Sequence, residues 1–240
     1  MKVRQHSTKV PKADALAAVE ARVIACRLCP RLVAHREEVA RVKRRAYRDC
    51  EYWGRPVPGF GDPRARLLVL GLAPAAHGGN RTGRIFTGDR SGDWLFRALH
   101  RAGLASQPTS SHRGDGLNLR GAYISAAARC APPDNKPASE ELDRCRPYLE
   151  EEFRILRPRA ILALGGIAFE AALNLLDGEG AALPRPRPRF GHGTRFRIAA
   201  GLPVIIASYH PSQQNTQTGR LTEAMLDAAV AAAREAAGIA

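Results

Sequence analysis

Four short apolar runs punctuate the chain and predict strands that are buried on both faces. These runs lie at 67–72 (LLVLGL), 122–128 (AYISAAA), 160–165 (AILALG) and 203–208 (PVIIAS). Apolar residues at helical spacing predict helices at 12–25, 91–103, 139–156, 167–176 and 221–237. Because strand and helix signals alternate along the chain, the pattern predicts an α/β fold with a parallel sheet and helices on both of its faces.

The segments between these elements are predicted to be surface connections. Residues 106–120 are polar and rich in Ser and Gly, and residues 183–190 (LPRPRPRF) predict a stiff, basic, extended loop. Pro147 lies within the helix predicted at 139–156. We expect it to break that helix, because proline has no backbone N–H to donate.

The chain has 240 residues, of which 45% are hydrophobic, and it can bury one large core. We therefore expect a single domain over 1–240, with residues 1–11 as a flexible basic N-terminus. No apolar run approaches the roughly 20 residues that span a bilayer, and the first residues lack the apolar core of a signal peptide. The expectation is a cytoplasmic protein with no membrane partner, and a monomer.

Basic residues exceed acidic ones by a wide margin. There are 37 Lys and Arg against 23 Asp and Glu, which gives a net charge of +14. Such a charge favours a polyanionic partner such as nucleic acid, although a genome of high GC content also enriches Arg and Ala. Residues 41–48 place Lys43, Arg44 and Arg45 on a predicted basic helix, which either tracks DNA phosphates or is an ordinary solvated surface.

Four of the five cysteines have a spacing that suggests a metal site. Cys26 and Cys29 form a C-x2-C pair, and 14 residues separate Cys130 from Cys145. In a reducing compartment such cysteines bind a metal more often than they form disulfides. Four thiolates suit either a zinc ion or a [4Fe-4S] cluster, and buried free thiols are the further alternative. Cys50 has no partner spacing and is interpreted as a free thiol.

The segment 71–89 (GLAPAAHGGNRTGRIFTGD) follows the first apolar run as a nucleotide-binding loop follows its strand. It lacks the lysine and the spacing of a P-loop. Its only carboxylate is Asp89, and Gly71, Ala73 and Ala75 are small. The loop is therefore expected to approach something flat closely, with reactive groups supplied from elsewhere.

Five features in a fixed order carry a resemblance. They are ACRLCP, the segment 71–89, RCAPPDNKP, Cys145 and SYHPSQQN at 208–215, and over about residues 20–225 they resemble a family 5 (type b) uracil-DNA glycosylase. The resemblance implies a three-layer αβα sandwich with a central four-stranded parallel sheet. It also implies a [4Fe-4S] cluster in a structural role, away from the reaction centre, held by Cys26, Cys29, Cys130 and Cys145.

The resemblance further implies a monofunctional glycosylase that removes uracil and other deaminated bases, such as hypoxanthine, from double-stranded DNA in base excision repair. Such an enzyme must flip its target nucleotide out of the stack into a pocket. The backbone from Gly71 to Pro74, with the small Ala73, would contact the base. Phe86 would stack on the base, and an ordinary core position is its alternative.

Two side chains are candidates for the chemistry. His210 is expected to donate a hydrogen bond to the departing base, with its imidazole kept neutral by basic surroundings, and a turn before Pro211 is its alternative role. Asp89 is expected to stabilise the cationic sugar or to position water. Its alternative role is the N-cap of the following helix.

The remaining candidates concern substrate choice and DNA contact. Ala73 and Ala126 stand where other branches of the superfamily carry polar side chains, which predicts a roomier and less selective pocket. Asn135 and Asn215 are the amides near the motifs, and each is either a substrate contact or a turn residue. The residues expected to contact DNA in the polar segment 212–220 are Gln213, Gln214 and Arg220.

Two other classes of protein are weighed against this interpretation. A non-catalytic, metal-stabilised nucleic-acid-binding protein explains the charge and the cysteines, but it leaves the segment 71–89 and SYHPSQQN without a role. An iron–sulfur redox protein would explain the cysteines alone, and no flavin or nicotinamide motif supports it.

Overall fold

The structure, a computed structural model, describes residues 10–240. Residues 1–9, most of the expected N-terminal segment, lie outside the described residues. Four parallel strands form the centre of one sheet, namely β2 (Leu67–Gly71), β3 (Ala122–Ala126), β4 (Ala160–Leu164) and β6 (Val204–Ser208). They fall within the four predicted runs, so the four-stranded parallel sheet is confirmed.

Two short strands extend this sheet. β1 (Phe60–Gly61) and β5 (Arg195–Phe196) pair antiparallel at its two edges, in the order β1-β3-β2-β4-β6-β5. The sequence does not predict them, because two residues are too few to show a period.

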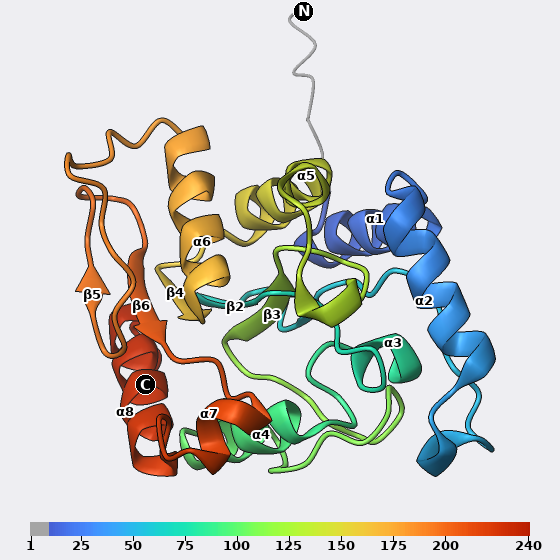
Figure 1. The fold of residues 1–240 in the computed structure, drawn as a ribbon. Coiled ribbons are helices and arrows are strands. Elements are labelled where there is room, and N and C mark those ends of the chain that lie inside the picture. The colour runs from blue at the N-terminus through green and yellow to red at the C-terminus, as the bar shows by residue number, and fades with distance from the viewer. Residues whose placement is uncertain (1–9) are drawn as a thin grey trace, which may run out of the picture.

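Helices cover both faces of the sheet (Figure 1). α6 (Gly166–Gly178) and α5 (Ser139–Leu156) lie on one face, with α1 (Lys12–Ala25) packed on α5. α4 (Arg90–Arg101) and α8 (Glu223–Ala237) lie on the other face. The expected three-layer αβα arrangement is therefore confirmed.

Strand side chains alternate between the two hydrophobic cores. Leu67 and Val69 of β2 belong to the core under α4 and α8, whereas Leu68 and Leu70 belong to the core under α5 and α6. All the residues of β2 are buried. Burial on both faces is the reason why each strand is a continuous apolar run rather than an alternating one.

The remaining helical elements are short or lie at the margin. They are α2 (Pro30–Val42), η1 (Arg45–Tyr47), α3 (Gly79–Thr82), η2 (Pro133–Asn135) and α7 (Gln213–Gln217).

Two expectations about helices are wrong. The basic helix expected over 41–48 ends at Val42, because Lys43 adopts a φ of 56° that a helix cannot continue through. Pro147 does not break α5, which runs from Ser139 to Leu156 with the proline inside it. Burial of Leu149 and Phe153 on the same helix outweighs the lost backbone hydrogen bond.

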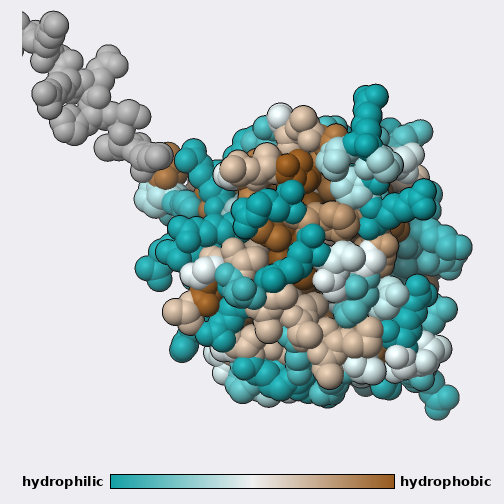
Figure 2. Space-filling view, turned by 90° about the vertical axis from the view of Figure 1, so that its left-hand side faces the viewer, coloured by the Kyte–Doolittle hydropathy of each residue, from teal (hydrophilic) through white to brown (hydrophobic). Residues whose placement is uncertain are grey.

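The carboxyl ends of the four parallel strands share one edge of the sheet, where parallel α/β sheets usually place their sites. Along residues 10–240, no helix combines the length and the apolar character that a membrane crossing requires. Figure 2 shows the face on the side of β5 and α6, where hydrophilic residues surround a smaller apolar area.

Candidate active site and cysteine cluster

A cavity of about 530 Å³ opens at the carboxyl edge of the sheet. Its volume is in the range of small-ligand sites. The lining residues come from four separate segments and are Leu72, Ala73, Ala75, Phe86, Asp89, Ser91, Asp134, Asn135, His210, Ser212, Gln213 and Gln214. A larger hollow of about 820 Å³, beside Pro158 and Pro203, lies at the amino ends of β4 and β6 instead.

His210 reaches this cavity because it follows β6 by two residues. Its ring lies 5.7 Å from the ring of Phe86, centroid to centroid, with an interplanar angle of 31°. Burial lowers the pKa of His210 to about 4. The imidazole is therefore neutral at pH 7, as expected, but burial rather than the basic surroundings is the cause.

Asn215 supports His210 from behind. Its side-chain Nδ2 donates a hydrogen bond to the backbone oxygen of His210 at 2.8 Å. Asn215 is not among the residues that line the cavity. The structure therefore places this predicted substrate contact where it positions His210.

Asp89 combines both of the roles considered for it. Its Oδ1 accepts a hydrogen bond from the backbone N–H of Gly92 at 2.9 Å, which makes it the N-cap of α4. Its carboxylate also lines the cavity, and a Cβ on Gly78 would collide with Oδ2. Burial raises the pKa of Asp89, which the backbone N–H of Gly92 partly opposes.

Phe86 is held in an unusual backbone conformation. Its φ is 53°, a left-handed value that costs a residue other than glycine on the order of 1–3 kcal/mol. Its ring packs on Gly71, where a Cβ would lie 2.8 Å from Cε2. Gly71 is thus small to make room for Phe86, and it does not itself line the cavity.

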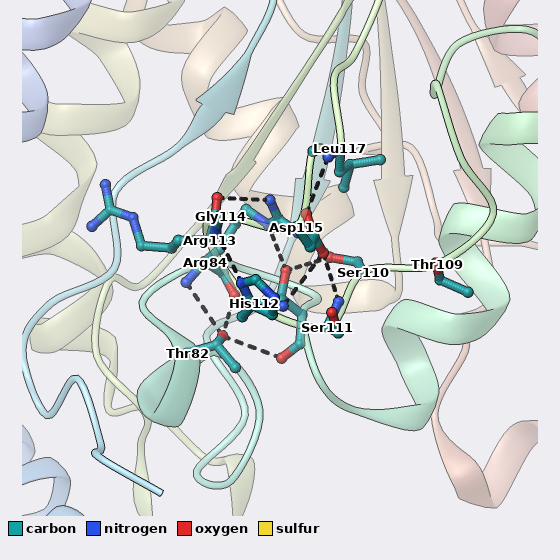
Figure 3. A network of polar contacts seen from close by, with 12 residues as sticks. Thr82, Arg84, Thr109, Ser110, Ser111, His112, Arg113, Gly114, Asp115 and Leu117 are labelled. Atoms are coloured by element: carbon teal, nitrogen blue, oxygen red, sulfur yellow. Dashed lines mark hydrogen bonds and ion pairs between the residues drawn. The ribbon is translucent and has the colours of Figure 1, made fainter.

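A buried ion pair holds the residues on both sides of Phe86 (Figure 3). Arg84 Nη2 lies 2.6 Å from Asp115 Oδ2, and Nε donates to Thr87 Oγ1 at 3.0 Å. Ser110 accepts from Arg84 Nη2 at 2.8 Å, which ties the loop 106–120 to the segment 71–89. This network fixes the strained turn that presents Phe86.

Asp115 carries the charge of this network. Burial alone would raise the pKa of Asp115, but the Arg84 guanidinium and the backbone N–H groups of Leu117 and Ser111 lower it to about 2. The carboxylate is therefore ionised at neutral pH. Sequence reasoning missed this pair, because residues 31 apart in two loops show no local spacing.

Asn135 lines the cavity as predicted, and its neighbour Asp134 does so too. Both have left-handed φ values, 56° and 52°. Left-handed backbone is strained for residues other than glycine, and Asn and Asp tolerate it best. Asp134, Ser91 and Ser212 are cavity residues that the sequence did not single out, since their surroundings equally fit a turn or a cap.

The residues expected to contact DNA separate into two groups. Gln213 and Gln214 line the cavity from α7, a short helix capped by Ser212 where a flexible loop was expected. Arg220 places its guanidinium 4.6 Å from the centroid of the Tyr209 ring, next to His210 in the chain.

The basic residues after α2 lie outside the cavity. Arg44 and Arg45 are exposed, and Lys43 Nζ donates to the backbone oxygen of Arg48 at 3.2 Å. They form a separate basic surface, which the structure does not bring to His210 or Asp89.

Ala126 also lies away from the cavity. It is fully buried at the end of β3, opposite Gly71, in the core that contains Phe86. The small side chain at this position therefore gives Phe86 room, and only Ala73 widens the cavity directly.

The four cysteines with suggestive spacing gather at one place. Burial raises the pKa of the Cys145 thiol, and the thiols of Cys29 and Cys26 raise it further. Burial raises the pKa of Cys130 to about 12, and Cys145 and Cys26 contribute in the same direction. All five cysteines are free thiols, and Cys50 is half-buried in the turn after η1.

Chain segments connect the cysteines to the cavity without placing them in it. Cys130 lies five residues before Asn135, so one segment runs from the cysteines to the cavity. Asn80, within the segment 71–89, donates from Nδ2 to the backbone oxygen of Arg36 on α2 at 3.1 Å. No cysteine lines the cavity, which fits a structural role for them.

Comparison with known proteins gives consistent relatives. The family model described as "Uracil DNA glycosylase superfamily" matches residues 58–234. A type-5 uracil-DNA glycosylase of Mycobacterium bovis is 54% identical over 95% of this chain and 84% of its own length. A type-5 enzyme of Thermus thermophilus is 53% identical over 90% of this chain and 95% of its own. A type-4 uracil-DNA glycosylase of Pyrobaculum aerophilum is 32% identical over 68% and 74%.

Proposed function

The chain belongs to the uracil-DNA glycosylase superfamily, and we propose that it removes uracil and other deaminated bases, such as hypoxanthine, from double-stranded DNA. The reaction hydrolyses the N-glycosyl bond between the base and its deoxyribose. The observation that carries this proposal is the cavity in which His210 and Asp89 stand with Phe86 and Asn135. A cavity of this size can hold a base that has been flipped out of the duplex.

Cleavage of the N-glycosyl bond needs stabilisation on both sides of the breaking bond. The base leaves with negative charge, and the neutral His210 imidazole donates a hydrogen bond to it from a buried position. The sugar acquires positive charge, which the Asp89 carboxylate stabilises electrostatically. The same carboxylate is an acceptor that can orient the attacking water.

The composition of the cavity favours water as the nucleophile. The lining residues include no lysine, so the cavity offers no amine to form a Schiff base with the sugar. The enzyme would therefore be monofunctional and would leave an abasic site in an intact strand. Such a site breaks only when alkali is added.

The same proposal includes a [4Fe-4S] cluster bound by Cys26, Cys29, Cys130 and Cys145. The mutual effect of these thiols on one another's pKa supports it, as does the Cys130 Sγ that accepts from Arg36 Nη1 at 3.1 Å. Over the described range, no three His, Cys, Asp or Glu side chains are grouped as ligands of a single metal ion. A cluster binds each thiolate to a different iron, so its ligands stand farther apart than those of one zinc ion.

The proposed breadth of substrate depends on the space beside Ala73. In Ala73→Leu the added side chain should exclude the larger purine base, lowering hypoxanthine release relative to uracil release by about tenfold or more. Single-turnover assays on duplexes carrying uracil or hypoxanthine measure the ratio. An unchanged ratio, or no hypoxanthine release by the wild type, would contradict the proposed breadth.

The pH dependence should separate His210 from Asp89. His210, with a pKa near 4, stays neutral down to about that pH, so it should give no inflection near its ordinary value of about 6.5. Asp89 has a raised pKa, so wild-type activity should fall as the pH drops through it. In Asp89→Asn that limb should vanish, leaving a decline only near pH 4. An inflection near pH 6.5 in this variant would show that His210 titrates normally.

A further inference from the structure

A buried arginine stands directly beside the four cysteines. Arg36 lies on α2 with only 2% of its side chain exposed. Its Nη1 donates to Cys130 Sγ at 3.1 Å and lies 3.4 Å from the backbone oxygen of Cys26. The side chain thus joins the two halves of the cysteine set, which are far apart in the sequence.

The charge of Arg36 has no dedicated carboxylate. The carboxylate paired with it is Glu37, whose Oε1 lies 3.7 Å from Nη2. Glu37 is about half exposed, and Arg27 already binds it through two hydrogen bonds of 2.6 and 3.3 Å. Arg36 Nε has no hydrogen-bond partner among residues 10–240. A buried cation with so little compensation is costly unless another anion stands beside it.

The other buried arginines of the chain are compensated. Arg129 lies 2.6 Å from Glu152 Oε2, and both side chains are almost completely buried. The same Glu152 oxygen accepts from Ser125 Oγ at 2.7 Å. Arg84 has Asp115 in the network described above. Arg36 is therefore an exception that needs an explanation.

Positive charge also gathers around the other cysteines. Arg144 stands beside Cys29, and Arg129 stands beside Cys145 and donates to it from its backbone N–H. Arg129 Nε and Nη1, like Arg36 Nε, find no partner in the described chain. A site lined in this way is suited to an anionic group with several acceptor sulfurs.

We propose that Arg36 is the charge partner of the four-cysteine site, where its guanidinium binds the Cys130 thiolate and offsets the negative charge of the thiolate-bound cluster. Four thiolates outweigh the charge of the iron–sulfur core, so the ligated cluster is an anion. Arg36 thereby supplies the compensation that the site needs, and the cluster supplies the anion that Arg36 lacks. This inference rests on the cofactor proposed above.

The test removes the charge and keeps the bulk. Arg36→Met should release iron to a chelator about 10- to 100-fold faster than the wild type, followed as loss of absorbance near 400 nm. Arg36→Lys keeps the charge but not the planar fork, and it should lie between the two. Arg41→Met is the matched control, because Arg41 lies on the same helix, is exposed and pairs with Glu38. Its bleaching rate should equal that of the wild type.

The midpoint potential of the cluster separates a charge effect from a packing effect. Loss of a cation and a hydrogen bond beside the sulfurs should shift the potential of Arg36→Met to more negative values, whereas mere entry of water would shift it to more positive ones. A positive or unchanged potential would overturn the inference, and so would a bleaching rate equal to that of Arg41→Met. A wild type that contains no iron would instead refute the cofactor itself.

Discussion

The Asp89→Asn variant should excise uracil roughly a hundredfold or more slowly than the wild type under single-turnover conditions. The substitution removes only the negative charge that faces the sugar cation, together with the acceptor that orients water. A hundredfold loss corresponds to about 2.7 kcal/mol of transition-state stabilisation. Rapid-quench measurements on a duplex with one uracil give the rate constant directly.

The same variant controls for the structural role of Asp89. Asn caps a helix about as well as Asp, and its Oδ1 can still accept from the backbone N–H of Gly92. The melting temperature should therefore change by no more than about two degrees. Wild-type rates in Asp89→Asn would reduce Asp89 to a cap and leave His210 and backbone groups to stabilise the transition state.

His210→Ala should cost a similar factor, because it removes the donor to the departing base. If Asp89 and His210 act on the same transition state, the double variant should lose less than the product of the two single losses or match it, depending on their coupling. An unaffected rate in His210→Ala would contradict the assignment of the donor.

The second large effect is expected at the cysteines. Cys145→Ser should lose most of its iron and its absorbance near 400 nm, and much of the protein should become insoluble, because metal binding and folding are coupled. Cys145 is a buried residue of α5, so the loss should spread to the helices packed around it. Iron content, absorbance and soluble yield measure the three consequences.

Cys50→Ser is the matched control for this experiment. Cys50 is half-buried in the turn after η1, and its backbone N–H bonds to the oxygen of Tyr47 at 3.1 Å, which serine preserves. Colour and iron content should remain those of the wild type. A Cys145→Ser protein that stays soluble and keeps its full iron content would refute the ligand set.

The fold was largely predictable because its strands are buried on both faces. Residues such as Leu67 and Leu68 serve different cores, yet both must be apolar, and this makes β2 visible as a continuous run. The two-residue strands β1 and β5 had no such signal. Pro147 showed the limit of local rules, since tertiary packing carries α5 through it.

The candidate site was predictable where one residue type performs one task. His210 and Asp89 stood out because few other side chains near the motifs can donate to an anion or stabilise a cation. The role of Gly71 was not visible, because it depends on the ring of Phe86 that packs against it in three dimensions. The Arg84–Asp115 pair was equally hidden, because only the fold brings its two loops together.

The central claim, that this chain hydrolyses the N-glycosyl bond of uracil in DNA, is tested most directly with a labelled duplex that contains a single uracil opposite guanine. After incubation with the wild-type protein, free uracil should appear, and the labelled strand should break at that position only when alkali is added. A protein that binds the duplex, yet releases no uracil and creates no alkali-sensitive site, would contradict the claim and identify a non-catalytic DNA-binding protein.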